Sequence, residues 1–182
     1  MTQWTKFALA AAAGGVAAIF AATPAYAAGD DGMVKSLCKV EISADEVATP
    51  SRRPETVGFI KRVDGQVAVL RPTRDGVDEL KGEVGMDLHA YDAVVTGSNG
   101  GFDAIFTDNS TVSGVADTCI EISKYVYKPA QKKGEFRMRL GRGVVSVAAG
   151  SVAKIKGDTM SVKVRNDTNL AVTGTRIVIR AK

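Results

Sequence analysis

The sequence predicts an all-β fold for most of the chain, from residue 57 to the C-terminus. No window of eleven residues in this part has the 3.6-residue apolar repeat of an amphipathic helix. Apolar residues instead alternate in runs of roughly four to eight residues that are bounded by Gly or Asp. The chain has 19 glycines against 5 prolines, as is typical of many tight turns. We therefore predict one all-β domain of many short strands over residues 57–182, β-helix-like or roll-like, with a β-sandwich as the alternative.

Two segments precede this domain. Lys6 is followed by an apolar, alanine-rich run over residues 7–22, and residues 25–27 (Ala-Tyr-Ala) have the pattern of a cleavage site. The run is shorter than the roughly 20 residues of a membrane span. We predict a signal peptide over residues 1–27, cut after Ala27, and export to the periplasm or the exterior with no remaining membrane span. Residues 28–56 are predicted to be an N-terminal arm or linker.

The chain has two cysteines, Cys38 and Cys119. Cys38 lies in residues 34–42, the one part of the arm with mild apolar alternation. In an oxidising compartment two cysteines often pair, and a bridge that closes so long a loop would stabilise the fold by roughly 4 kcal/mol in the chain-entropy model. The alternative is one buried thiol and one free thiol. We predict the disulfide, and we predict no metal or cofactor, because two cysteines and one histidine at wide spacing match no ligand pattern.

Residues 92–110 predict a β-hairpin. Val94 and Thr96 alternate as far as Gly97, and residues 98–101 form a glycine-rich turn. Phe102, Ala104 and Phe106 then share one face of a second strand, which ends at the turn residues Asp108, Asn109 and Ser110. Farther along the chain, we predict three short strands over residues 135–140, 143–148 and 151–155.

Several of these residues, in their order along the chain, resemble the motifs of the FecR-like domain family. The pattern Leu88…Asp92-x-Val94-x-Thr96-Gly97 has Tyr91 where the family has glycine, and Phe106-x-Asp108-Asn109-Ser110 has Asn where glycine is usual. Asn also adopts the left-handed conformation readily, so the second departure is mild. Near the C-terminus, Thr173-Gly174-Thr175 stands where the family has Arg-Gly-Thr. The family signature, with a structural role, comprises Gly65, Asp92, Thr96, Gly97, Phe106, Asp108, Ser110, Tyr125, Tyr127, Pro129, Gly174 and Thr175.

This resemblance, over about residues 57–182, implies a periplasmic β-rich domain. The best-known members are inner-membrane regulators that relay a signal from an outer-membrane transporter to a sigma factor. That role needs a membrane span and a cytoplasmic anti-sigma segment, neither of which we find in this sequence. The signalling role is therefore not carried over whole.

We expect no catalytic activity. His89 is the one histidine, and no Gly-x-Ser-x-Gly nucleophile motif accompanies it, so we interpret it as an ordinary strand residue. Asp92, Asp103 and Asp108 are interpreted as turn formers whose carboxylates cap backbone N–H groups. Calcium binding by Asp103 or Asp108 together with Asp117 is the alternative, but the spacing fits no calcium loop.

A run of basic residues is the most suggestive functional feature. It comprises Lys124, Lys128, Lys132, Lys133, Arg137, Arg139 and Arg142. The net charge of +4 and the pI near 9.1 favour anionic surfaces weakly and do not indicate nucleic acid. The alternative is that the basic run has no ligand and is a solvent-exposed sheet edge that its lysines keep soluble. We predict a non-enzymatic binding or scaffold module for an envelope protein or an anionic polysaccharide, with an accessory sensor domain in FecR-type signalling as the alternative.

Overall fold

A computed structural model describes residues 55–74, 76–157, 159–164, 168–173 and 176–181 of the chain. The predicted signal peptide, nearly all of the predicted arm with Cys38, and the signature residues Gly174 and Thr175 lie outside the described residues. Within these described ranges, no helix is long and apolar enough to cross a membrane.

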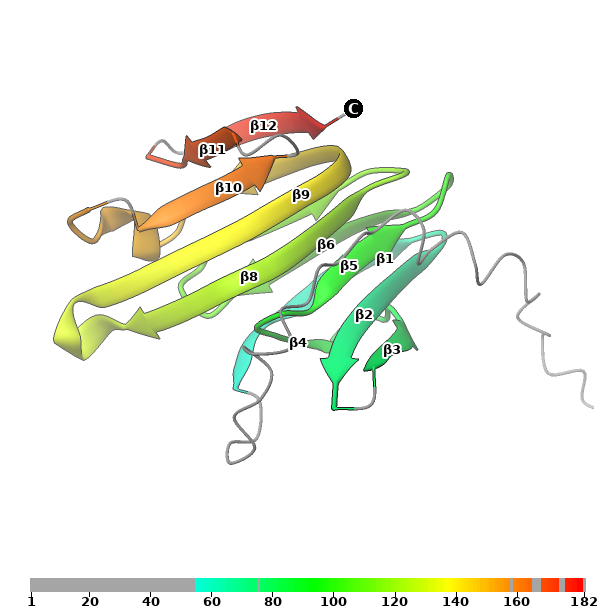
Figure 1. Cartoon of the computed structure of the whole chain (residues 1–182), viewed down its shortest axis with the longest axis horizontal. Coiled ribbons are helices and arrows are strands. Elements are labelled where there is room, and N and C mark those ends of the chain that lie inside the picture. The colour runs from blue at the N-terminus through cyan, green and yellow to red at the C-terminus, as the bar shows by residue number, and fades with distance from the viewer. Residues whose placement is uncertain (1–54, 75, 158, 165–167, 174–175, 182) are drawn as a thin grey trace, which may run out of the picture.

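The described chain consists of strands and two short 3₁₀ turns, which confirms the predicted all-β class (Figure 1). The elements are β1 (Thr56–Asp64), β2 (Val67–Thr73), β3 (Gly76–Lys81), β4 (Asp87–His89), β5 (Ala93–Thr96), β6 (Gly101–Phe106), β7 (Thr111–Gly114), β8 (Cys119–Lys128), η1 (Pro129–Gln131), β9 (Lys133–Ala148), η2 (Val152–Lys154), β10 (Met160–Val164), β11 (Thr168–Ala171) and β12 (Arg176–Ala181).

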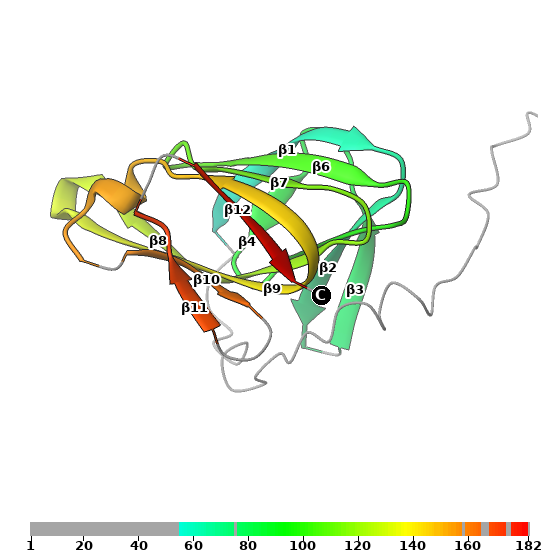
Figure 2. The same ribbon diagram turned by 90° about the horizontal axis from the view of Figure 1, so that it is seen from above.

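The strands form one curled, roll-like sheet. Its main path is β3-β2-β5-β8-β9-β7-β6-β1-β4, in which every neighbouring pair is antiparallel. The curl brings β1, β6 and β7 over β2, β8 and β10, so that the sheet has two facing layers (Figure 2). β10 joins β9 in parallel, and β12 joins the other half of β9. Curling lets one sheet bury its concave face without a helix to cover it.

β9 is the strand that both layers share. Its first part pairs with β8 as far as Arg142, and its last part, from Gly143, pairs with β12. Gly143 at the bend has a φ of +92°, and a Cβ there would lie 2.4 Å from the Thr118 hydroxyl oxygen. Glycine is therefore required at this corner. The two strands predicted over residues 135–140 and 143–148 are thus one bent strand.

The predicted hairpin over residues 92–110 is wrong, because β5 and β6 belong to different layers. β5 pairs with β2 and β8, whereas β6 pairs with β1 and β7. The chain between them turns the corner at Gly97 and Gly100, where a Cβ on Gly100 would lie 2.2 Å from the Gln66 carbonyl oxygen. The glycines allow this corner to lie directly on the corner between β1 and β2 rather than to close a hairpin.

Two threonine hydroxyls connect the neighbouring corners. Thr96 is fully buried, donates to the Val115 carbonyl at 2.6 Å and accepts the Thr118 N–H at 2.9 Å. The Thr118 hydroxyl in turn donates to the Val144 carbonyl at 3.2 Å. These bonds satisfy backbone groups that the turning chain leaves unpaired, so Thr96 has a structural role.

The core fills the space between the layers. Three of its aromatic rings pack together. The ring centroids of Phe106 and Phe136 are 4.5 Å apart, and those of Tyr125 and Phe136 are 5.0 Å apart. Aliphatic side chains of both layers complete it, including Ile60, Val69, Leu88, Val94, Val112, Met138, Leu140, Val145, Val147 and Val162.

Asn109 has a φ of +64°, in agreement with the interpretation that it replaces a turn glycine. Replacement of the exposed Asn109 by Gly should therefore leave the free energy of unfolding within about 0.5 kcal/mol of the unmodified protein, whereas Asn109→Val should cost about 1–2 kcal/mol, because a β-branched side chain is strained at this φ. Urea denaturation of both variants measures the difference. Equal stability of the two would contradict the strain argument.

Candidate functional site

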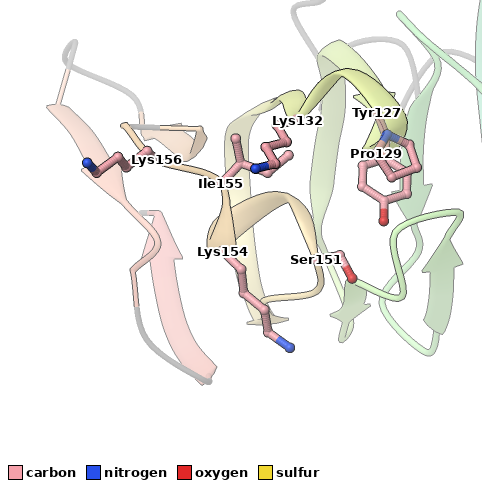
Figure 3. Close-up of a pocket in the computed structure, with 7 residues that line it drawn as sticks. All are labelled: Tyr127, Pro129, Lys132, Ser151, Lys154, Ile155 and Lys156. Atoms are coloured by element: carbon pink, nitrogen blue, oxygen red, sulfur yellow. The ribbon is translucent and has the colours of Figure 1, made fainter.

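A pocket of about 430 Å³ lies at one end of the curled sheet, between the tip of the β8–β9 hairpin and the segment around η2 (Figure 3). The residues that line it are Tyr127, Pro129, Lys132, Ser151, Lys154, Ile155 and Lys156. It therefore combines three lysines with a tyrosine, a proline, an isoleucine and a serine.

The β8–β9 hairpin forms one wall. Lys128 pairs with Lys133 at the end of the ladder, and Pro129 begins η1, for which its fixed φ is suited. Lys132 closes the turn with a φ of +49°, and its N–H donates to the Pro129 carbonyl at 3.0 Å. This tight turn places Lys132 at the pocket, whose opposite wall contains Ile155 (Figure 3).

The η2 segment forms the other wall, where the sequence predicted a strand over residues 151–155. Its apolar anchor is Ile155, whose Cδ1 would lie 2.6 Å from a Cβ on Gly134. The missing side chain of Gly134 thus makes room for Ile155 against β9. Val152 is fully buried beneath the same turn, so the exposed Lys154 and Lys156 are left on the outside. Because β10 pairs with β9 in parallel, the chain must return from the end of β9 toward its start before β10 begins, and η2 lies in this connection.

The buried carboxylate of Asp108 holds η2 in place. Its Oδ2 accepts the Val152 N–H at 3.1 Å and the Ser110 hydroxyl at 2.6 Å. Its backbone carbonyl accepts the Ser151 N–H at 2.8 Å. Asp108 is fully buried, and it also accepts the Ser110 N–H at 3.1 Å, so it caps a turn as predicted. The Phe-x-Asp-x-Ser turn therefore holds in place the segment that forms one wall of the pocket.

Tyr125 completes this network from β8. Its hydroxyl donates to Asp108 Oδ1 at 3.1 Å and accepts the Asp108 N–H at 3.0 Å. Burial raises the pKa of this hydroxyl well above its usual value. The phenol therefore keeps its proton and remains a hydrogen-bond donor to the carboxylate.

A second buried carboxylate, Asp92, lies elsewhere in the fold. Arg71 contacts it with two hydrogen bonds, Nε to Oδ1 at 2.9 Å and Nη2 to Oδ2 at 2.7 Å, and the His89 N–H donates to Oδ2 at 2.9 Å. Asp92 thus caps a backbone N–H, as predicted, but its main partner is a charge that the sequence analysis did not assign. Burial, and then the charge of Arg71, lower the pKa of His89.

Asp103 was predicted to be a turn former and is not. It lies within β6, opposite Arg62 of β1, and the Arg62 Nε contacts its Oδ2 at 2.7 Å. The hydrogen bond from Arg62 lowers the pKa of the Asp103 carboxyl. In the part of the chain that the structure describes, no group of three or more His, Cys, Asp or Glu side chains could hold a metal ion.

Some cations of the predicted basic run have an ion-pair partner on the sheet. Glu135 contacts Lys124 at 2.9 Å and Arg137 at 2.6 Å, and the Lys124 hydrogen bond is the main reason that the pKa of Glu135 is lowered. Arg139 lies 3.6 Å from Glu121. These three cations are thus partly neutralised on the outer face of the sheet.

Lys132 alone of the predicted run lines the pocket. Lys128, Lys133 and Arg142 are exposed on β8 and β9 outside the pocket lining. The sequence analysis missed Lys154, Lys156 and Ser151. Among the described residues, no carboxylate lies within ion-pair distance of Lys132, Lys154 or Lys156. The alternation Lys154-Ile155-Lys156, which keeps one apolar residue inside and two cations outside, is the signal that could have indicated this wall.

Of the predicted disulfide, the structure describes one end. Cys119 is buried, at 3% exposure, and disulfide-bonded. Cys38 lies outside the described residues, so the pairing of these two cysteines stays a prediction.

No family model, no curated protein and no solved structure matched the chain. The resemblance to FecR-like domains therefore stays a prediction from the motifs.

Proposed function

We propose that this protein is an exported, non-enzymatic module that binds an anionic envelope polysaccharide in the lysine-lined pocket. The observation that carries the proposal is the set of three pocket lysines, which have no carboxylate partner among the described residues. Lysine ammonium groups are hydrated point charges on flexible stems, and they suit carboxylates or phosphates that need no fixed geometry.

The other lining residues favour a sugar over a simple ion. Tyr127, Pro129 and Ile155 offer apolar surface, and the Ser151 hydroxyl lies beside them. Sugar-ring C–H groups can pack on such surfaces while the anionic substituents meet the lysines. Lys154 and Lys156 extend to different sides of η2 (Figure 3). Cations spread in this way match a polymer that carries several charges better than they match one small anion.

The variant Lys132→Gln/Lys154→Gln/Lys156→Gln tests the pocket. Each exposed charge contributes up to about 1 kcal/mol, so the affinity for polygalacturonate oligosaccharides should fall by roughly tenfold to a hundredfold. Binding should also weaken as salt is added, because the contacts are exposed. Isothermal titration calorimetry at two ionic strengths measures both effects.

The matched control Lys61→Gln/Arg74→Gln/Arg180→Gln removes three exposed positive charges outside the pocket. It should bind nearly as well as the unmodified protein, and a neutral oligosaccharide of equal length should not bind to either. Equal losses in the two triple variants would indicate non-specific attraction and would reject the pocket as the site. If the unmodified protein binds no anionic glycan at low salt, the proposed function is wrong.

A further inference from the structure

A second apolar cluster lies on the convex face of the sheet, opposite the core. Along β2, β5 and β8, the side chains of Val69, Val94 and Ile120 belong to the core between the layers. Side chains alternate across a strand, so their neighbours point the other way. These neighbours form a separate cluster, here called the outer strip, of Leu70, Ala93, Val95 and Cys119. Strand pairing aligns it, because Leu70 lies opposite Ala93 and Val95 lies opposite Cys119.

The outer strip is shielded from water although it faces away from the core. Leu70 and Cys119 are 3% exposed, Val95 is 2% exposed and Ala93 is fully buried. Among the described residues, Val77 of the edge strand β3 is the one partly buried hydrophobic side chain that packs on it. Val77 lies opposite Pro72, near one end of the strip. The described residues thus supply one further hydrophobic side chain to the strip, although its four members are at most 3% exposed.

The sequence offers one segment that fits. Cys119 belongs to the strip and is disulfide-bonded, and Cys38 is the other cysteine of the chain. In residues 34–42, period-two alternation gives one face of Val34, Ser36, Cys38, Val40 and Ile42 and an opposite face of Lys35, Leu37, Lys39 and Glu41. The cysteine thus lies within a mostly apolar face, and the opposite face is mostly charged. Residues 39–55 could span roughly 60 Å when extended, which is ample to return from the strip to β1.

We propose that residues 34–42 form an extended strap that lies on the outer strip and is fixed there by a Cys38–Cys119 disulfide. Val40 and Ile42 cover Leu70, Ala93 and Val95, while Lys35, Lys39 and Glu41 face water. The strap gives the convex layer a second small core, which that side of a curled sheet otherwise lacks. Reduction of the disulfide loosens the strap and makes the strip accessible.

Peptide mapping tests the bridge directly. Mass spectrometry of the non-reduced, thiol-blocked protein should find the peptides of Cys38 and Cys119 joined within one chain. Alkylation of both cysteines without reductant, or a dimer on a non-reducing gel, would overturn the proposal.

Thiol reactivity tests whether the strap covers the outer strip. In the variant Cys38→Ser, the lone thiol of Cys119 should react slowly with a thiol reagent, because Val40 and Ile42 still cover it. Adding Val40→Asp and Ile42→Asp should speed this reaction at least about tenfold by opening the cover, whereas adding Lys35→Asp and Leu37→Asp, on the opposite face, should not. Equal rates of Cys119 modification in the two pairs of Asp variants would refute the proposed position of the strap on the outer strip. Protection that grows with protein concentration would assign the cover to a second copy instead. Circular dichroism verifies that each variant is folded. If a variant does not fold, peptide mapping of the unmodified protein still tests whether Cys38 and Cys119 are joined.

Discussion

Replacement of Arg71 by Leu should destabilise the protein by about 3–5 kcal/mol, because it leaves the carboxylate of Asp92 buried without its countercharge. Asp92 is fully buried, and the Arg71 side chain is 24% exposed. The His89 N–H would still donate a hydrogen bond to the carboxylate. Urea denaturation with a check for two-state behaviour measures the loss.

Two further variants separate the buried charge from the lost contacts. The double variant Arg71→Leu/Asp92→Leu should recover part of the stability, because it removes both charges together. The control Arg62→Leu breaks a comparable bidentate contact with Asp103, but at side chains that are 50% and 33% exposed, and should destabilise the protein far less than Arg71→Leu does, because water screens the exposed pair. If Arg71→Leu lost only as little stability as Arg62→Leu, the buried carboxylate of Asp92 would not need Arg71 as its countercharge.

Replacement of Asp108 by Ala should cost about 3 kcal/mol or more and should also weaken glycan binding. The change leaves the Val152 N–H, the Ser110 hydroxyl and the Tyr125 hydroxyl without their acceptor, and each buried group left unsatisfied costs roughly 1–3 kcal/mol. Because the same carboxylate holds η2, the wall with Lys154 and Ile155 should lose its position. Chemical denaturation and calorimetric titration measure the two effects.

Replacement of an exposed aspartate provides the control for Asp108→Ala, because it removes a carboxylate without disturbing the buried hydrogen bonds. Asp78→Ala, on the edge strand β3, removes the same charge from an exposed site and should change stability by less than about 0.5 kcal/mol. Tyr125→Phe removes one hydrogen-bond donor to Asp108. Its loss of stability should be smaller than that of Asp108→Ala and larger than that of Asp78→Ala. If Asp108→Ala lost stability but kept full glycan binding, η2 would not depend on this carboxylate.

Local patterns along the chain were enough to predict the fold class and several corners. Period-two alternation predicted Phe102, Ala104 and Phe106 on one face of a strand, and β6 has that face. Asn109 was predicted to replace a glycine and has a positive φ. Tyr91, in the place of another motif glycine, also has a positive φ of 73°. Such features depend on the backbone of a few neighbouring residues, and that information is local.

Pairing and layer membership could not be predicted in the same way. β5 and β6 follow each other closely and still join different layers, since a glycine corner can close a hairpin or cross between layers. The sequence likewise predicted three strands where β9 bends as one strand and η2 turns, because the decision depends on contacts with Thr118 and Asp108, far away in the chain.

The basic run between residues 124 and 142 illustrates the division most clearly. Composition and alternation, which are properties of neighbouring residues, predicted an all-β chain with a cationic stretch after Tyr125. Which of these cations face a carboxylate and which line a pocket became visible in the folded chain. Glu135 lies between Lys124 and Arg137, whereas Lys132 lines one pocket together with Lys154 and Lys156. The physical reason is that ion pairing and pocket formation depend on distances between side chains that the curl of the sheet brings together.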